Sequence, residues 1–171
     1  MQTVILFPTQ AEAEGFSTAH PDAEVRICGV GMVRTAACVA RLLHEGYRRF
    51  VLAGIAGSYG GRLPKGSVVA VAEERVAGLP AAYADSYRAT WVPQGLETVT
   101  SNTVTSCGAE PDGADIENME GAALFALCRE FGADCCQIRA ISNTVGENRS
   151  GWEAGKALAA LHETLYKTIC R

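Results

Sequence analysis

The 171-residue chain lacks the features that mark a nucleic-acid-binding or membrane-binding protein. It has no run of five or more basic residues, and 15 Lys and Arg against 19 Asp and Glu leave a formal net charge of -4. Binding to a phosphate backbone or an anionic lipid surface requires clustered positive charge. The apolar N-terminal run ends at Pro8, far short of a membrane span, and no basic segment precedes it as in an export signal. We therefore expect a cytoplasmic protein that binds neither nucleic acid nor membrane.

Patterns typical of metal sites and disulfide frameworks are also missing. The seven cysteines form no CxxC pair, and their odd number without an export signal favours a reducing compartment. The three histidines, His20, His44 and His162, are far apart, and no two have metal-ligand spacing. Cys135 and Cys136 lie within an apolar run, where packing is a more economical role than redox chemistry or metal binding. The sequence therefore predicts no metal site.

A nicotinamide cofactor is disfavoured by the residues after the first glycine pair. Gly29 and Gly31 come after a predicted strand, but the third glycine of a dinucleotide fingerprint is absent. No acidic residue ends the next strand, which closes at Ala53. We therefore expect no nicotinamide cofactor.

Short apolar runs rich in β-branched residues alternate with helical periodicity, which is typical of an α/β protein. A chain of this length with 48% hydrophobic residues fills one core, so residues 1–171 are expected to form a single domain. Residues 77–97 show no clear period and are expected to be irregular. The predicted strands cover residues 4–7, 25–28, 50–53, 68–72 and 135–141. The predicted helices begin near residue 10, cover 32–45 and 118–131, and end the chain around 158–165.

Four polar or glycine-rich segments stand at the ends of apolar strands, where open α/β sheets bind their ligands. They comprise residues 9–12, 54–58, 118–121 and 142–143. The glycines of residues 54–58 would allow the backbone to approach a ligand closely, although a crowded turn also explains them. Their shared position indicates one ligand-binding edge.

Glu12 and Glu120 are the acidic residues closest to these strand ends. Two carboxylates that face one cleft can divide glycosidic cleavage between them, because one activates water and the other holds the sugar as it becomes positive. Acidic residues also favour the first turn of a helix because of its dipole, so both explanations stay open.

Three further residues are considered both for ligand binding and for a structural role. The amide of Asn143 can hydrogen-bond a purine edge or cap the loop after it. Arg139 is a charge inside an apolar run, so we expect a structural partner for it, such as a carboxylate. Trp152 is interpreted as an anchor of the last helix rather than a ligand contact.

Four segments together resemble the nucleoside phosphorylase and nucleosidase superfamily. They are Gly-Val-Gly-Met-Val from residue 29, Ala-Gly-Ile-Ala-Gly-Ser from 53, Asp-Ile-Glu-Asn-Met-Glu-Gly-Ala-Ala from 115 and Ile-Arg-Ala-Ile-Ser-Asn from 138. The Gly-Ile-Ala-Gly-Ser stretch and the Ser-Asn ending resemble the futalosine hydrolases more than the methylthioadenosine/S-adenosylhomocysteine nucleosidases. The resemblance covers nearly the whole chain in order. It implies a three-layer domain in which a central mixed, twisted sheet is flanked by helices.

The resemblance also implies roles for individual residues. Glu12 matches the residue that activates the attacking water, and Met119 with Glu120 matches the pair that holds the ribose. Further substrate-binding positions are Gly54, Ile55, Ala56 and Ser142.

Asn143 falls where the adenine-cleaving nucleosidases have an aspartate that protonates the base. An amide cannot act as a general acid, but it can stabilise hypoxanthine, which carries negative charge better than adenine. The resemblance therefore implies hydrolysis of futalosine to hypoxanthine and dehypoxanthine futalosine, in menaquinone biosynthesis, by a homodimer without a cofactor.

The sequence departs from this family in length and in two residues. The segment before Val25 and the region 79–97 are short, Ile55 stands where some relatives have serine, and Gln10 replaces an acidic residue. Two alternatives therefore stay open. One is a phosphorylase, for which Arg34 is the best-placed anion-binding residue, and the other is a nucleoside-binding module that does not catalyse.

Overall fold

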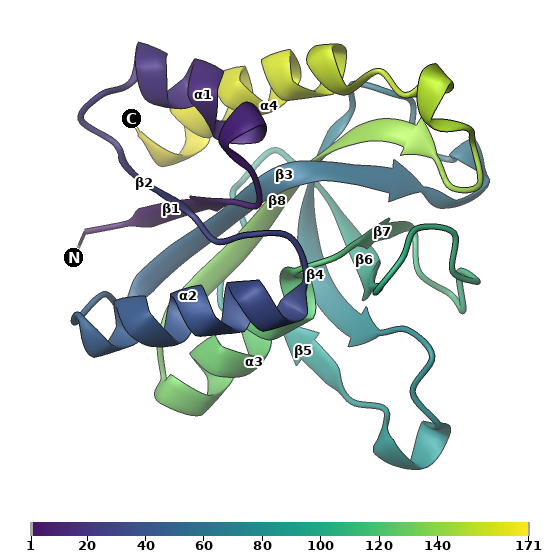
Figure 1. The fold of residues 1–171 in the computed structure, drawn as a ribbon, viewed down its shortest axis with the longest axis horizontal. Helices are drawn as coiled ribbons and strands as arrows, with labels where there is room; N and C mark the ends of the chain where they lie inside the picture. Colours follow the sequence, from purple (N-terminus) through teal and green to yellow (C-terminus); the bar gives the residue numbers. More distant parts are fainter. Residues whose placement is uncertain (1, 171) are drawn as a thin grey trace.

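The computed structural model describes residues 2–170, which form one eight-stranded sheet with helices on both faces (Figure 1). The helices are α1 (Gln10–Ala19), α2 (Met32–His44), α3 (Gly121–Phe131) and α4 (Ala154–Ile169). The strands are β1 (Val4–Phe7), β2 (Glu24–Ile27), β3 (Arg49–Ser58), β4 (Val68–Val76), β5 (Ser86–Arg88), β6 (Glu97–Thr103), β7 (Ile116–Asn118) and β8 (Asp134–Thr144). None of the described helices is long and apolar enough to cross a membrane.

The helices form the two outer layers. Helices α1 and α4 lie on one side of the sheet, and α2 and α3 lie on the other (Figure 1). Strands β3 and β8 run through the middle and are buried along most of their length. The three-layer α/β architecture expected from the sequence is confirmed.

The strands pair in a mixed parallel and antiparallel order. β3 pairs in parallel with β1 and β8, and β8 pairs antiparallel with β4. β4 also pairs with β6, β6 with β7, and β7 with β3, so these strands form a closed ring.

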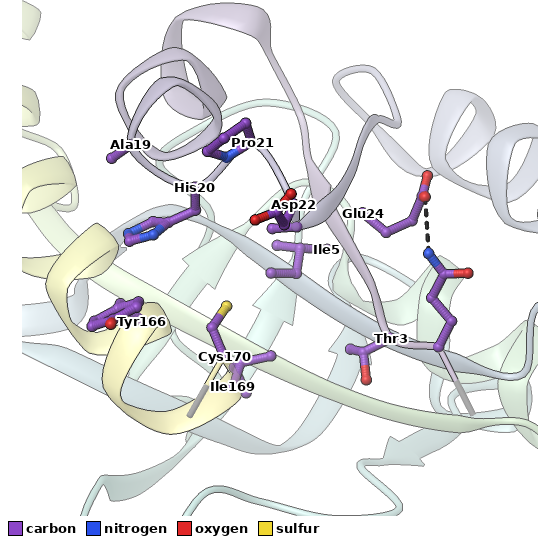
Figure 2. Close-up of a pocket in the computed structure, with 12 residues that line it drawn as sticks. Thr3, Ile5, Ala19, His20, Pro21, Asp22, Glu24, Tyr166, Ile169 and Cys170 are labelled. Carbon is purple, nitrogen blue, oxygen red and sulfur yellow. Dashed lines mark hydrogen bonds between the residues drawn. The ribbon is translucent and has the colours of Figure 1, made fainter.

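At the amino ends of β1 and β2 there is a cavity of about 400 Å³, near both ends of the described chain. Figure 2 shows this cavity, where the His20 ring stacks on Tyr166 with centroids 4.5 Å apart.

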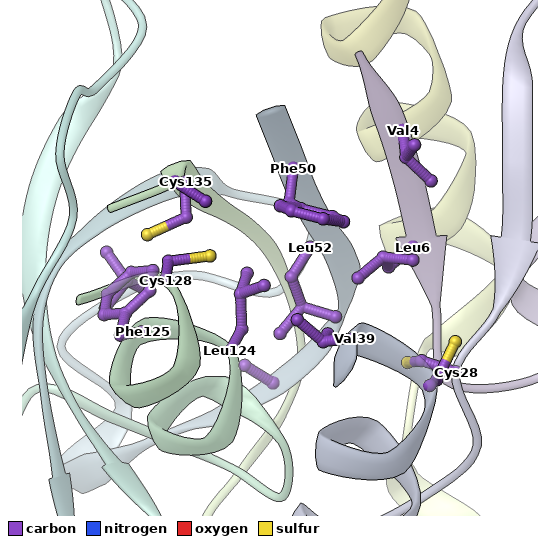
Figure 3. Packing of buried hydrophobic residues seen from close by; sticks show 14 of the residues in the cluster. Val4, Leu6, Cys28, Val39, Phe50, Leu52, Leu124, Phe125, Cys128 and Cys135 are labelled. Atoms are coloured by element: carbon purple, nitrogen blue, oxygen red, sulfur yellow. The ribbon is translucent and has the colours of Figure 1, made fainter. Parts of the chain in front are cut away.

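Two hydrophobic clusters fill the space between the layers. Figure 3 shows the one beneath α2 and α3, where Cys128 and Cys135 face each other beside Phe125. Cys136 points to the opposite face of β8 and joins the cluster beneath α1 and α4. Both Cys135 and Cys136 are fully buried in these hydrophobic clusters, as a packing role requires.

The strand predicted for residues 50–53 is longer than expected, and the crowded turn considered for residues 54–58 is not formed. Residues 54–58 continue β3, which stays paired with β8 as far as Ser58 and Thr144. Gly54 is needed because of close packing rather than a turn, since a β-carbon there would lie 2.6 Å from Arg139 Nη1. Gly57 likewise lies beneath Asn143, whose Nδ2 would be 3.1 Å from a β-carbon.

Two other boundaries differ from the sequence prediction. Helix α3 begins at Gly121 rather than Asn118, because residues 116–118 pair as β7. The Asn118 side chain still caps the helix, since its Oδ1 accepts from the backbone N–H groups of Glu120 and Gly121, each at 2.8 Å. The region 77–97, predicted to be irregular, contains the short strand β5, which pairs with β4.

Candidate active site

A second cavity, of about 420 Å³, lies at the carboxyl ends of β1, β3 and β8, on the opposite edge from the cavity in Figure 2. Its size is suitable for a small organic ligand such as a nucleoside. Seven of the eight predicted site residues line it: Glu12, Ile55, Ala56, Met119, Glu120, Ser142 and Asn143. The eighth, Gly54, is not among the described residues that line the cavity and lies behind it, against Arg139.

Glu12 is fixed in the first turn of α1, just after β1 ends. Its Oε2 accepts from the hydroxyl of Thr9 at 2.7 Å, and its Oε1 accepts from the backbone N–H of Ile55 at 3.1 Å. Thr9 also caps the helix through its side chain. Only 8% of Glu12 is exposed, yet each oxygen keeps a further lone pair for a molecule in the cavity.

Glu120 reaches the same cavity from the start of α3. Its Oε1 accepts from the backbone N–H of Gly31 at 3.1 Å, and its Oε2 accepts from Arg139 Nη2 at 3.1 Å. Arg139 is 1% exposed, so the carboxylate partner expected for it from the sequence is present. The ion pair holds the Glu120 carboxylate in a fixed position at the cavity wall.

Arg139 belongs to a buried polar network that extends behind the cavity. Its Nη2 also donates to Asn118 Oδ1 at 3.0 Å and Gln137 Oε1 at 3.1 Å. The amide groups of Asn118 and Gln137 both donate to Glu74 Oε1, and the hydroxyl of Thr103 donates to Glu74 Oε2 at 2.7 Å. Burial raises the pKa of Glu74, and the hydrogen bonds from Gln137 and Thr103 oppose that shift.

Asn143 lines the cavity from the end of β8. Its Oδ1 accepts from the hydroxyl of Ser142 at 2.8 Å, and its Nδ2 donates to the backbone oxygen of Thr144 at 3.1 Å. An amide nitrogen carries two N–H groups, so one remains for a ligand. Asn143 thus offers a hydrogen-bond donor and no dissociable proton.

Several residues around the cavity were not predicted as site residues. Glu117 accepts from the hydroxyl of Tyr59 at 3.0 Å and from the backbone N–H groups of Gly108 and Ala109, and so fixes the loop after β6. Trp152 lines the cavity, although the sequence favoured a purely structural role, and the Arg149 guanidinium lies 5.3 Å from its ring centroid. Only its aromatic character marked Trp152 as a possible contact.

Neither a metal site nor an anion site at Arg34, the residue considered for the phosphorylase alternative, is supported by the geometry. Within residues 2–170, no group of three or more His, Cys, Asp or Glu side chains is arranged to hold a metal ion. Arg34, the anion-binding candidate, is exposed on α2 and is absent from the described residues that line the cavity.

Residues 102–171 match the family model of the Phosphorylase superfamily. The futalosine hydrolase of Streptomyces coelicolor is 30% identical over an alignment that covers 81% of this chain and 75% of that protein.

Two solved structures from Helicobacter pylori share the fold. A futalosine hydrolase mutant aligns with a TM-score of 0.84 and 15% identity over 96% of this chain and 97% of its own. A 5'-methylthioadenosine/S-adenosylhomocysteine nucleosidase with butyl-thio-DADMe-Immucillin-A also gives 0.84 and 15% identity, over 98% and 97%. The identity of 30% over most of both chains leads to one assignment: the chain belongs to the futalosine hydrolase family.

Proposed function

We propose that this protein hydrolyses the N-glycosidic bond of a purine nucleoside, and that the nucleoside is futalosine. The observation that carries the proposal is the placement of Glu12, Glu120 and Asn143 around one cavity of nucleoside size. Two carboxylates and one amide donor supply the three functions that this reaction needs. One group accepts a proton from water, one binds the sugar, and one stabilises the leaving purine.

In the proposed reaction, the bond between the ribosyl carbon and the purine nitrogen lengthens first, so positive charge develops on the sugar. Glu120 accepts hydrogen bonds from the ribose hydroxyls and stabilises that charge. Glu12 accepts a proton from a water molecule as the water oxygen bonds to the ribosyl carbon. The bonding electrons leave with the purine, which Asn143 stabilises through its remaining N–H group.

The contacts and positions of the arginines near the cavity favour hydrolysis over phosphorolysis. Arg139 Nη2 donates to three oxygens of the protein, so that nitrogen is already committed. Arg34 lies outside the described lining, and Arg149, which does line the cavity, lies over the Trp152 ring at 5.3 Å from its centroid. Water as the nucleophile requires none of these arginines.

We further propose a homodimer in the cytoplasm that acts in menaquinone biosynthesis. Val33 is 84% exposed and Val30 is 46% exposed, and Val30 also lines the cavity. A second copy packed on these valines would cover the cavity mouth and bury apolar surface. All seven cysteines are free, which suits a reducing compartment.

Chromatography of free purine tests the reaction. The protein is incubated with futalosine, aminodeoxyfutalosine, inosine and methylthioadenosine in phosphate-free buffer, and then with phosphate. We expect hypoxanthine from futalosine at a rate that phosphate does not change. Release that requires phosphate or arsenate would identify a phosphorylase, and nucleoside binding without release would identify a binding module.

A further inference from the structure

The Glu74 carboxylate is fully buried on β4, and it is not among the described residues that line the cavity. A buried carboxylate is costly unless hydrogen bonds compensate for the lost water. Glu74 has three side-chain donors, from Asn118, Gln137 and Thr103. No sequence pattern singles it out, and the proposed reaction does not use it.

Glu74 fixes the orientation of two amides. Asn118 and Gln137 both direct their NH₂ groups at Glu74 Oε1, which accepts a hydrogen bond from each. Their oxygens then point the other way, and both accept from Arg139 Nη2, at 3.0 and 3.1 Å. The same nitrogen donates to Glu120. Because Arg139 Nε has no hydrogen-bond partner within the described chain, the terminal nitrogens hold this side chain.

Glu74 also supports the backbone that carries Glu120. The Thr103 hydroxyl donates to Glu74 and accepts from the backbone N–H of Ala122 at 2.8 Å, in the first turn of α3. A side chain at Gly121 would overlap both the Glu74 carboxylate and the Gln137 amide oxygen. The start of α3 therefore packs directly against the Glu74 carboxylate.

We propose that Glu74 is a positioning residue for Glu120, acting through Asn118, Gln137 and Arg139. It aligns the two amide oxygens that hold the Arg139 guanidinium, and Arg139 then holds Glu120 Oε2 toward the cavity. This inference rests on the proposed role of Glu120 at the ribose. It predicts that a change at Glu74 affects recognition of the sugar and leaves recognition of the purine base intact, because Asn143 has no contact in this network.

The test is the substitution Glu74→Gln, compared with Glu73→Gln one residue earlier on the same strand. Glu73 pairs with Arg75 and Arg88 at the other side of β4 and has no part in the network. Two quantities are measured for each variant: kcat/KM for futalosine, and Kd for free hypoxanthine by calorimetry. The wild-type assay shows first whether the proposed function itself holds.

For Glu74→Gln we expect kcat/KM to fall about 10- to 100-fold, because an introduced amide must turn Asn118 or Gln137 and displace the catalytic carboxylate. The Kd for hypoxanthine should stay within about twofold of wild type, because a larger change would be expected only if a hydrogen bond to the base were lost. Glu73→Gln should match wild type in both. Equal losses in kcat/KM and hypoxanthine affinity would show a general structural role and overturn the proposal, as would an unchanged kcat/KM in an active enzyme.

Gln137→Met provides a second route if Glu74→Gln does not yield soluble protein. This substitution removes one of the two amide links with little change in volume. We expect the same selective fall in kcat/KM, about 5- to 20-fold, since one of the two amide bridges remains. Hypoxanthine affinity reduced to the same degree would contradict the proposal.

Discussion

Arg139 Nη2 lies 3.1 Å from Glu120 Oε2, and the two side chains are only 1% and 4% exposed. A buried ion pair of this kind adds little net stability, because removing both charges from water costs about as much as their attraction returns. Its value here is geometric, since it fixes a carboxylate at the cavity wall. Replacing one partner alone would leave the other charge buried and unpaired, so a single substitution in this pair should reduce both activity and stability.

Glu12→Gln should abolish most hydrolysis while the fold remains. An introduced amide oxygen can still accept from the Ile55 backbone N–H, but an amide cannot take a proton from water. We expect kcat to fall about 10²- to 10⁴-fold with little change in Tm. Steady-state kinetics and thermal melts measure both, and the exposed Glu14→Gln on the same helix is the control. Near-normal kcat would remove Glu12 from the catalytic machinery.

Asn143→Asp should change which purine leaves. The introduced carboxyl would face the Thr144 backbone oxygen, where Asn143 now donates, and that contact favours retention of a proton. A protonated carboxyl can act as a general acid toward adenine. The ratio of adenine release from methylthioadenosine to hypoxanthine release from futalosine should rise at least about tenfold, as expected for one general acid. An unchanged ratio would show that Asn143 does not contact the base.

Gly54→Ala should inactivate the enzyme from behind the cavity. The added methyl would lie 2.6 Å from Arg139 Nη1 and 3.1 Å from Glu12 Oε1, so both side chains must move. A displacement of about 1 Å at a catalytic group can cost about 10²-fold in rate, so we expect a loss of that order in kcat/KM.

Gly155→Ala is the matched control, because nothing lies within 4 Å of a β-carbon at that position in α4. It should keep full activity and raise stability by about 0.5–1 kcal/mol, since alanine is the better helix former. A fully active Gly54→Ala would show that the close packing on Gly54 is not required.

The Lys65–Glu147 ion pair should stabilise the loop between β8 and α4 in a pH-dependent way. Lys65 Nζ donates to Glu147 Oε1 and to the Gly151 backbone oxygen, each at 2.7 Å, and it lowers the pKa of Glu147 below the usual 4.5. A lowered folded-state pKa gives stabilisation that is present above about pH 4.5 and is lost as the pH falls through the folded value.

Melting temperatures of wild type and Lys65→Met between pH 8 and pH 3 measure this effect. The difference in Tm should be constant down to about pH 5 and shrink below it. Lys156→Met, which removes an exposed pair with Glu153, is the control and should show a smaller difference throughout. A Tm difference independent of pH would indicate that Lys65 acts only through Gly151.

Much of the fold and site could be predicted from the sequence. The β-branched runs of β1 and β8 indicate buried strands because both layers cover them, and the periodic apolar residues of α2 and α4 indicate helices. Five of the predicted site residues meet at one cavity because β1, β3 and β8 are parallel and their carboxyl ends share an edge. Met119 and Glu120 follow β7, which is antiparallel to β3, so this rule does not explain their position.

The parts that could not be predicted depend on partners far away in the sequence. Strand β6 was missed because its residues are polar, and Ser101 and Thr103 are buried only because they hydrogen-bond Asn118 and Glu74. Glu74 itself carries no local signal, since its partners come from β6, β7 and β8. Such a network becomes visible only when the strand pairing is known.

The pairing of β3 with β8 couples two glycines to two polar side chains. Gly54 is the cross-strand neighbour of Arg139, and Gly57 is the neighbour of Asn143. Each glycine leaves the volume that the side chain on the adjacent strand occupies. The two positions of each pair must therefore change together during evolution or redesign: enlarging residue 57 requires a smaller residue at 143. Because 57 and 143 lie apart from the Arg139 network, altering the purine preference of this scaffold can begin there.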